Sequence, residues 1–379
     1  MVQITKEHRS VCHISTAHEA SATRIFHKEA KSLLQAGYKV VIIAQAKKTE
    51  IVDGIKIIAL PTPRNRIDRF LKLGLKMLKL ARKENADVYH FHDPELIGVG
   101  LILKLFGKKV IYDVHELVYY NIADKKWLKF GFFIKLVQFV YFIFESISVN
   151  VFDQLILAEQ SYEDYYNERY KKFKNYTIVR NMSILSFVDS PSRERESCNG
   201  KPVIVYVGGL SKVRGITQII ESMELIGGRA ELHLIGKWAS ESYRQECEAL
   251  AGFKYVKYLG FMSLNQVYDA LRNSDIGICI LYPIKNYVET TPVKAFEYMS
   301  CSLPMVMSNF PYWEKFFGEC AVFADPYNSQ HIADKIQFLL EHPEDAKRLG
   351  NRGKELVFNE YNWEIESKKL IKLYNELLE

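Results

Sequence analysis

Residues 287–309 contain the side chains whose types and spacing best suggest chemistry. Thr291 is a favoured helix N-cap and Pro292 suits the first helical position, so we expect a helix from here to about residue 301. Amides in the first turn of a helix have no helical partners, and they attract phosphate groups together with the helix dipole. Glu289 and Glu297, with seven residues between them, flank this predicted helix start.

Two carboxylates beside an anion site suit a sugar nucleotide better than phosphate alone. The amides would bind the diphosphate, and the carboxylates would accept hydrogen bonds from sugar and ribose hydroxyls. We therefore predict donor-binding roles for Glu289, Thr290, Thr291, Val293, Lys294 and Glu297. Spacing alone is equally compatible with an ordinary capped helix that carries two solvated glutamates.

A glycine turn with two cations follows an apolar strand predicted at residues 202–207. Gly208 and Gly209 allow the backbone to approach a ligand closely, and Lys212 and Arg214 add positive charge beside the turn. The planar guanidinium of Arg214 can bridge two phosphate oxygens. These four residues join the predicted donor site, although two glycines also occur in common tight turns.

Polar side chains follow two predicted strands of the first half. One strand ends in the segment from His90 to Glu95, which includes His92 and Asp93, and the other ends in the segment from Asp113 to Glu116. The carboxyl ends of parallel strands are where ligands bind. His90, His92 and Asp113 could ligate a metal together with His115 or Glu116, as in a metal hydrolase. A polar strand end needs no metal, however, and we predict none.

Length and composition indicate a soluble protein of two domains. The chain has 379 residues, of which 48% are hydrophobic and 25% charged. A net charge of +6 is modest, and we expect no nucleic-acid partner. Six scattered cysteines without a Cys-x-x-Cys pair favour buried thiols in a reducing compartment. The first residues lack the apolar core of a signal peptide, so we expect a cytoplasmic protein.

The order of strand and helix patterns predicts two α/β domains of the Rossmann-like, doubly wound type. We expect an N-terminal acceptor-side domain at residues 1–189, a polar linker at 190–200 and a nucleotide-sugar-binding domain at 201–362. A terminal helix at 363–379 is predicted to cross back to the first domain. Ligands would bind in a cleft between the two sheet edges.

Two helices of the first domain suggest contact with a membrane. Basic residues recur every three or four positions in the helix predicted at residues 63–83, opposite an apolar side that includes Ile67, Phe70 and Leu71. Such a helix could rest on an anionic membrane, or it could be an outer helix with a solvated basic face. The aromatic helix predicted at residues 127–145 is interrupted by Lys135, Gln138 and Glu145, so we expect a covered or interfacial helix and not a transmembrane one.

The two glutamates and the wording Pro-x-Lys-x-x-Glu-Tyr-Met at residues 292–299 resemble retaining GT-B glycosyltransferases of the family 4 type, the glycosyl transferases group 1. The resemblance extends to the opening around His18 and Arg24, although Ala22 replaces an aspartate there. It also includes the His-Asp-Pro-Glu and Asp-x-His-Glu segments at residues 92–95 and 113–116. In the donor motif Gly-Arg-Leu-x-x-x-Lys-Gly, Arg214 falls on the lysine and Gly209 falls on the arginine. Either Lys212 compensates for that loss or diphosphate binding is weaker than usual.

The resemblance implies a GT-B fold and a retaining, metal-independent transfer from a nucleotide-diphosphate sugar, with no other cofactor. It implies that Glu289 contacts the donor sugar, Glu297 the ribose and the Phe261 loop the base. His115 would position sugar or acceptor hydroxyls as a catalytic residue with Glu289, and His18, His92 and Asp93 would lie on the acceptor side. A basic, aromatic first domain suits a lipid-linked or oligosaccharide acceptor at the inner face of the plasma membrane, as in bacterial surface polysaccharide synthesis, including lipopolysaccharide.

Three alternatives stay open from the sequence. A metal hydrolase would use His90, His92 and Asp113. A non-catalytic GT-B subunit that binds nucleotide is favoured by Gly209 in place of arginine. A sugar-nucleotide epimerase would need no acceptor.

Overall fold

A computed structural model of the chain divides into two compact units, which are described separately. The first unit comprises Met1–Asn181 and Ile365–Glu379, and the second comprises Met182–Glu364. The structure describes residues 9–65, 68–123, 131–170, 174–188 and 200–379. Most of the predicted linker therefore lies outside the described residues.

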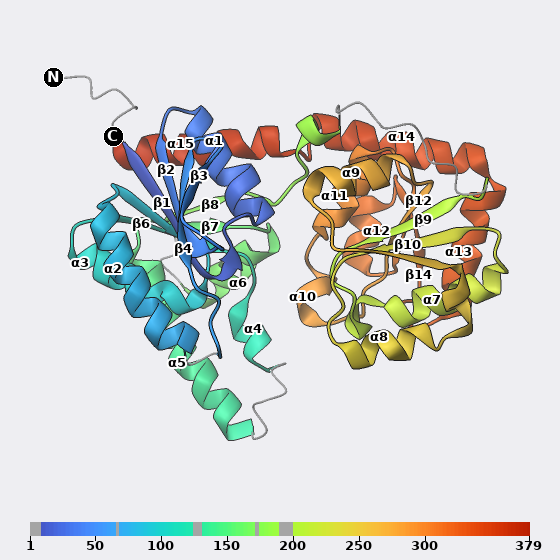
Figure 1. Cartoon of the computed structure of the whole chain (residues 1–379), viewed down its shortest axis with the longest axis horizontal. Coiled ribbons are helices and arrows are strands. Elements are labelled where there is room, and N and C mark those ends of the chain that lie inside the picture. Colours follow the sequence, from blue (N-terminus) through green and yellow to red (C-terminus); the bar gives the residue numbers. More distant parts are fainter. Residues whose placement is uncertain (1–8, 66–67, 124–130, 171–173, 189–199) are drawn as a thin grey trace. The chain divides into compact units, whose positions relative to one another are not determined.

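The first unit is built on an eight-stranded sheet in the order β3-β4-β2-β1-β5-β6-β7-β8 (Figure 1). The strands are β1 (Ser10–Glu19), β2 (Lys39–Gln45), β3 (Glu50–Val52), β4 (Ile55–Leu60), β5 (Val88–Phe91), β6 (Lys109–Val114), β7 (Gln154–Leu157) and β8 (Tyr176–Ile178). All paired neighbours are parallel except β3 and β4, an antiparallel hairpin that the sequence analysis did not anticipate. The chain leaves β1 toward β2 on one side and later returns to β5 on the other. Loops after β1 and β5 therefore meet at the topological switch point, where ligands bind.

Helices cover both faces of this sheet, as their apolar sides require. They are η2 (Thr23–Ala30), α1 (Lys31–Gln35), η3 (Asp68–Leu73), α2 (Gly74–Glu84), η4 (Pro94–Leu96), α3 (Ile97–Leu105), α4 (Val118–Ala123), α5 (Gly131–Val151) and α6 (Ser161–Arg169). The basic helix predicted at 63–83 is present as η3 and α2, but Ile67 lies outside the described residues and Phe70 is exposed. α5 covers much of the predicted aromatic helix, of which residues 127–130 are not described.

The second unit has a six-stranded sheet in the order β11-β10-β9-β12-β13-β14, with all pairs parallel. The strands are β9 (Val203–Val207), β10 (Glu231–Ile235), β11 (Val256–Gly260), β12 (Ile276–Cys279), β13 (Met305–Ser308) and β14 (Ala321–Ala324). The switch point lies between β9 and β12. The predicted glycine turn follows β9 and the predicted glutamate stretch follows β12, so the two motifs leave adjacent strands at one edge. This parallel sheet and the mixed sheet of the first unit confirm the predicted pair of Rossmann-like folds.

The helices of the second unit pack two apolar layers against this sheet. They are η5 (Leu185–Phe187), η6 (Lys212–Arg214), α7 (Ile216–Ile226), α8 (Glu241–Glu248), η7 (Ala251–Tyr255), α9 (Leu264–Arg272), α10 (Lys285–Val288), α11 (Val293–Ser300), α12 (Pro311–Phe317), α13 (Ser329–Glu341) and α14 (Pro343–Asn359). The last helix, α15 (Trp363–Leu378), contributes its residues from Ile365 onward to the first unit. There Tyr374 and Glu366 contact His90 and Arg180.

Candidate functional site

The glycine turn of the second unit is held in a shape that only glycine adopts easily. Gly208 has a φ of +133°, and its amide donates to the carbonyl of Ile235 at 2.9 Å. Gly236 has a φ of +147°, and a Cβ on it would lie 1.9 Å from the Gly208 carbonyl oxygen. Both positions therefore exclude side chains, and the ends of β9 and β10 can lie close together.

Two cations converge on this turn. A Cβ on Gly208 would lie 3.1 Å from Arg214 Nη1 and 3.1 Å from Lys294 Nζ. The Lys294 side chain is buried, and its Nζ has no hydrogen-bond partner among the described residues. That ammonium lies 3.6 Å from the centre of the Tyr206 ring, a cation–π contact. A buried ammonium without an anionic partner is costly, and a bound diphosphate would supply one.

This arrangement shows which cation could compensate for Gly209, which stands where the donor motif has an arginine. Gly209 is exposed, and its carbonyl accepts a hydrogen bond from the Tyr206 hydroxyl at 3.0 Å. Lys212 is exposed on η6. The second cation beside Arg214 at this turn is therefore Lys294, which arrives from α11.

α11 begins one residue later than predicted. Pro292 is extended, with φ −75° and ψ 121°, and forms the N-cap, so the prediction that Thr291 caps the helix and Pro292 opens it is wrong. The buried Thr291 and the extended Pro292 belong to the loop before the helix. The preceding loop is fixed because Trp313 Nε1 donates to the Thr290 carbonyl at 2.7 Å. Val293 is the first helical residue.

The remaining predicted donor residues lie around the same edge. Glu289 is exposed at the end of α10, and Glu297 is partly buried in the second turn of α11. Phe261 is exposed just after β11, and Lys237 Nζ lies 4.4 Å from the centre of its ring. A flat exposed ring of this kind can stack on a nucleotide base.

In the first unit, the strand ends form a buried network around Asp113. Asp113 accepts two hydrogen bonds from Arg24, at 2.8 and 2.9 Å, and contacts His115 Nε2 at 2.7 Å and His92 Nδ1 at 3.1 Å. Burial alone would raise the pKa of Asp113, but the guanidinium of Arg24 and the two histidines hold this pKa well below its ordinary value. Burial lowers the pKa of His92 to about 4. The network thus presents the partly exposed His115 next to a fixed carboxylate.

Asp93, in the loop after β5, and His18, near the end of β1, form a neighbouring cluster. Asp93 accepts from the Ser15 hydroxyl at 2.8 Å and from the amides of Thr16 and Ala17 at 2.5 and 3.0 Å. These bonds tie the C-terminal part of β1 to the loop after β5. His18 Nε2 lies 3.5 Å from Asp93 Oδ1, and its ring centre is 5.7 Å from that of His115. The predicted acceptor-side residues of this unit are therefore neighbours.

The sequence analysis assigned no site role to two buried residues of this region, His13 and Glu29. His13 pairs with His90 in the register of β1 and β5. Burial raises the pKa of Glu29 well above its ordinary value and lowers those of His13 and His90. Two groups in the described part of the chain could hold a metal ion: His13, Glu29, His90 and His92, and His92, Asp113 and His115.

Comparisons with known proteins agree with this geometry. The family model "Glycosyltransferase Family 4" matches residues 22–181, and "Glycosyl transferases group 1" matches residues 190–356. Among curated proteins, spore coat protein SA of Bacillus subtilis is 21% identical over 48% of this chain and 51% of its own length. Alpha-D-kanosaminyltransferase of Streptomyces kanamyceticus is 22% identical over 49% of this chain and 48% of its own length. The chain spans about half the length of these curated relatives.

Solved structures share the fold over almost the whole chain. Sucrose-phosphate synthase from Thermosynechococcus elongatus has a TM-score of 0.79 at 19% identity and covers 98% of this chain and 99% of its own. Anabaena HepE in complex with UDP-glucose has a TM-score of 0.71 at 13% identity and covers 97% and 100%. The two family matches fall on the two units, and the resemblance predicted from the sequence is confirmed. The chain belongs to the GT-B glycosyltransferases of the family 4 and group 1 type.

Proposed function

We propose that this protein is a retaining, metal-independent glycosyltransferase that moves a hexosyl or related group from a nucleotide-diphosphate sugar to a lipid-linked or saccharide acceptor. The observation that carries the proposal is the pair of cations, Arg214 and Lys294, at the glycine turn beside the start of α11. The UDP and UDP-glucose complexes of the structural neighbour HepE support this class of donor.

Diphosphate binding follows from charge and geometry at this turn. Gly208 and Gly209 carry no side chain, so phosphate oxygens can approach the backbone between the two cations. The first-turn amides of α11 at Val293 and Lys294 add donors and the positive end of the helix dipole. Glu289 and Glu297 then accept hydrogen bonds from the sugar and ribose hydroxyls.

The transfer breaks the bond from the anomeric carbon to the diphosphate and forms a bond from that carbon to an acceptor oxygen on the same face. The acceptor proton passes to an oxygen of the departing phosphate, so no side chain is assigned as general base. Arg214, Lys294 and the α11 dipole stabilise the charge that grows on the leaving diphosphate, which is the task a divalent cation performs in other transferases. His115, held by Asp113, positions hydroxyl groups of the reacting sugar or acceptor.

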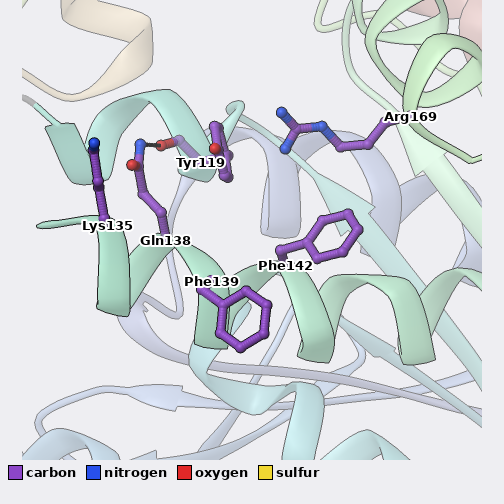
Figure 2. A pocket seen from close by; sticks show the side chains of 6 residues that line it. All are labelled: Tyr119, Lys135, Gln138, Phe139, Phe142 and Arg169. Carbon is purple, nitrogen blue, oxygen red and sulfur yellow. Dashed lines mark hydrogen bonds between the residues drawn. The ribbon is translucent and has the colours of Figure 1, made fainter.

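An apolar helix of the first unit supports a lipid-linked acceptor at a membrane. Exposed large side chains run along α5: Phe132, Phe133, Leu136, Phe139, Val140, Ile143, Phe144, Ile147 and Val151. Figure 1 shows the Gly131 end of α5 projecting beyond the other helices of the first unit. Beside this stripe, Lys135, Gln138 and Phe142 of α5 line a hollow of about 430 Å³ with Tyr119 and Arg169 (Figure 2). Two cations in an apolar hollow suit the phosphate of a lipid headgroup.

By length and composition α5 could cross a bilayer, and only 17% of its most apolar window is buried in the protein. Its far end, however, is anchored in the first unit. Glu145 is buried and accepts hydrogen bonds from Tyr141, Tyr165, Tyr166 and Tyr170 at 2.7 to 3.0 Å. Crossing a membrane would break these bonds, so we propose that α5 lies on the inner face of the plasma membrane. Bacterial surface polysaccharide synthesis is a process that needs such an enzyme.

The metal-hydrolase alternative is less consistent with the observed bonds. Asp113 already accepts hydrogen bonds from Nε and Nη2 of Arg24. His90 is buried and lies against Glu29 and Tyr374. A catalytic metal needs an open coordination position at which water and substrate can bind. The non-catalytic subunit stays the main rival, because it would bind the same nucleotide.

The test is a panel of UDP-, GDP-, ADP- and dTDP-sugars incubated with a membrane lipid extract, without added metal. We compare wild type with Arg214→Ala and Glu297→Ala, and use the exposed Arg229→Ala as the matched control. We expect product from wild type and the control, and little from the two site variants. Equal product from all four proteins would refute the site, and nucleotide binding without transfer to any acceptor would support the non-catalytic subunit.

A further inference from the structure

The first unit contains a compact group of metal-ligand side chains in its interior. His13 on β1 pairs with His90 on β5, and His92 follows two residues later, so all three rings project from one face of the sheet. Glu29 on η2 lies opposite these rings. His13, His90 and Glu29 have no exposed surface, and His92 is 3% exposed.

The ligand atoms are close enough together to share one metal ion. His13, Glu29, His90 and His92 can each offer one ligand atom, and these four atoms all lie within 4.8 Å of one another. Glu29 Oε2 is 3.7 Å from His13 Nδ1, 4.0 Å from His90 Nε2 and 3.7 Å from His92 Nε2, and the His13 and His92 atoms are 3.1 Å apart. Bonds of 2.0–2.1 Å to zinc place tetrahedral ligands about 3.3 Å apart. The 3.1 Å pair is close to this spacing, and the Glu29 oxygen would move closer to the three nitrogens on binding an ion.

Hydrogen bonds within the protein account for only part of this group: His13 Nδ1 and His92 Nε2 share one at 3.1 Å. Neither oxygen of Glu29, nor His90 Nε2, has a hydrogen-bond partner among the residues that the structure describes. Arg24 Nε lies 3.0 Å from Glu29 Oε1, but its hydrogen bond goes to Asp113. The Glu29 carboxyl group and the three imidazoles have few hydrogen bonds for groups so deeply buried, and a bound cation would satisfy all four at once.

Outer contacts orient two of the three imidazoles for this role. His90 Nδ1 lies 2.8 Å from the Tyr374 hydroxyl, and His92 Nδ1 lies 3.1 Å from Asp113 Oδ2. These bonds use the nitrogens that point away from the group and leave each Nε2 for a metal, as is usual for histidine ligands. The alternative group of His92, Asp113 and His115 is less suitable, because Asp113 is already engaged by Arg24. His13 Nε2 has no such partner in the described part of the chain.

We propose that His13, Glu29, His90 and His92 bind one Zn²⁺ ion that joins β1, β5 and η2. Three imidazoles and one carboxylate are ligands that zinc prefers, and Mg²⁺ or Ca²⁺ would need oxygen ligands. Four protein ligands in a closed interior leave no position for water, so the ion is structural and takes no part in sugar transfer. The site is therefore independent of the proposed donor chemistry.

The test starts with the intact chain, purified without a polyhistidine tag from zinc-supplemented medium. Elemental analysis should find about one zinc per chain, and chelation should lower the unfolding temperature by several degrees because bound metal stabilises the fold. Replacing zinc with Co²⁺ should give the visible absorption of a tetrahedral nitrogen and oxygen site. Zinc-loaded wild type that holds less than about a tenth of an equivalent would overturn the proposal.

Variants show whether these residues bind the ion. Glu29→Gln keeps the side-chain shape, and His90→Gln removes one ligand. Both should lose most of the bound cobalt and its absorption, while circular dichroism checks that they are folded. His27→Asn, on the same segment as Glu29 but outside the group, is the matched control and should bind as wild type does. A cobalt spectrum that is unchanged in folded Glu29→Gln and His90→Gln would contradict the assignment.

Discussion

The substitution Lys294→Met tests whether the Lys294 ammonium serves to bind the donor or to stabilise the fold. The Lys294 ammonium is buried, without a hydrogen-bond partner in the described residues, and contacts the Tyr206 ring at 3.6 Å. In the unliganded protein, methionine removes an uncompensated charge and keeps the chain length. The free energy of unfolding should therefore stay the same or rise, since the lost cation–π contact offsets only about 0.5–2 kcal/mol.

Donor binding should change in the opposite direction. A hydrogen bond between charged groups contributes about 1.5–3 kcal/mol, which corresponds to about 10- to 150-fold in affinity. Isothermal titration should show that loss with whichever of UDP, GDP, ADP and dTDP binds most tightly. The control variant Lys212→Met removes an exposed cation of the same turn, and it should change the affinity only about two- to threefold. Unchanged affinity in a folded Lys294→Met protein, or a larger loss in Lys212→Met, would refute the reasoning.

Three further perturbations test other parts of the account. Glu297→Gln should weaken nucleoside diphosphate binding by about tenfold because it loses a charged acceptor, and titration would measure this. Gly236→Ala should cost at least about 2 kcal/mol in urea unfolding, since its Cβ would lie 1.9 Å from the Gly208 oxygen, whereas Gly98→Ala, in helix α3 with open space around it, should not destabilise the protein. Phe139→Asp should reduce cosedimentation with phosphatidylglycerol vesicles about tenfold with an unchanged unfolding temperature, and Leu225→Asp, on α7, should leave it unchanged. Equal effects of Gly236→Ala and Gly98→Ala on stability, or of Phe139→Asp and Leu225→Asp on vesicle binding, would contradict the corresponding prediction.

Local patterns predicted the regular elements well because each has a strong hydrophobic period. α15 (Trp363–Leu378) starts where it was predicted and ends one residue earlier, and β9 starts one residue later than expected. The β3–β4 hairpin was missed because its two strands are short, and the outer one, β3, is not buried. The start of α11 was misplaced because Thr291 and Pro292 match the usual cap signals, while the chain extends for one more residue.

The site could be predicted only where its residues are close in sequence. Lys294 was predicted as a donor residue from its place at the helix start, but its pairing with Arg214 depends on α11 meeting the Gly208 turn, which requires the order of β9 and β12 in the sheet. His13 was missed in the same way, because a histidine inside an apolar strand gains meaning only from its register with His90. A polar residue in the middle of an otherwise buried strand was the available signal.

The central claim is that the diphosphate of a sugar nucleotide binds between Arg214, Lys294 and the first turn of α11. A crystal structure of the protein with its donor or with the corresponding nucleoside diphosphate tests this most directly. The account predicts phosphate oxygens within about 3 Å of Lys294 Nζ and of the Arg214 guanidinium. A diphosphate bound elsewhere, with the Lys294 ammonium still without an anionic partner, would contradict it.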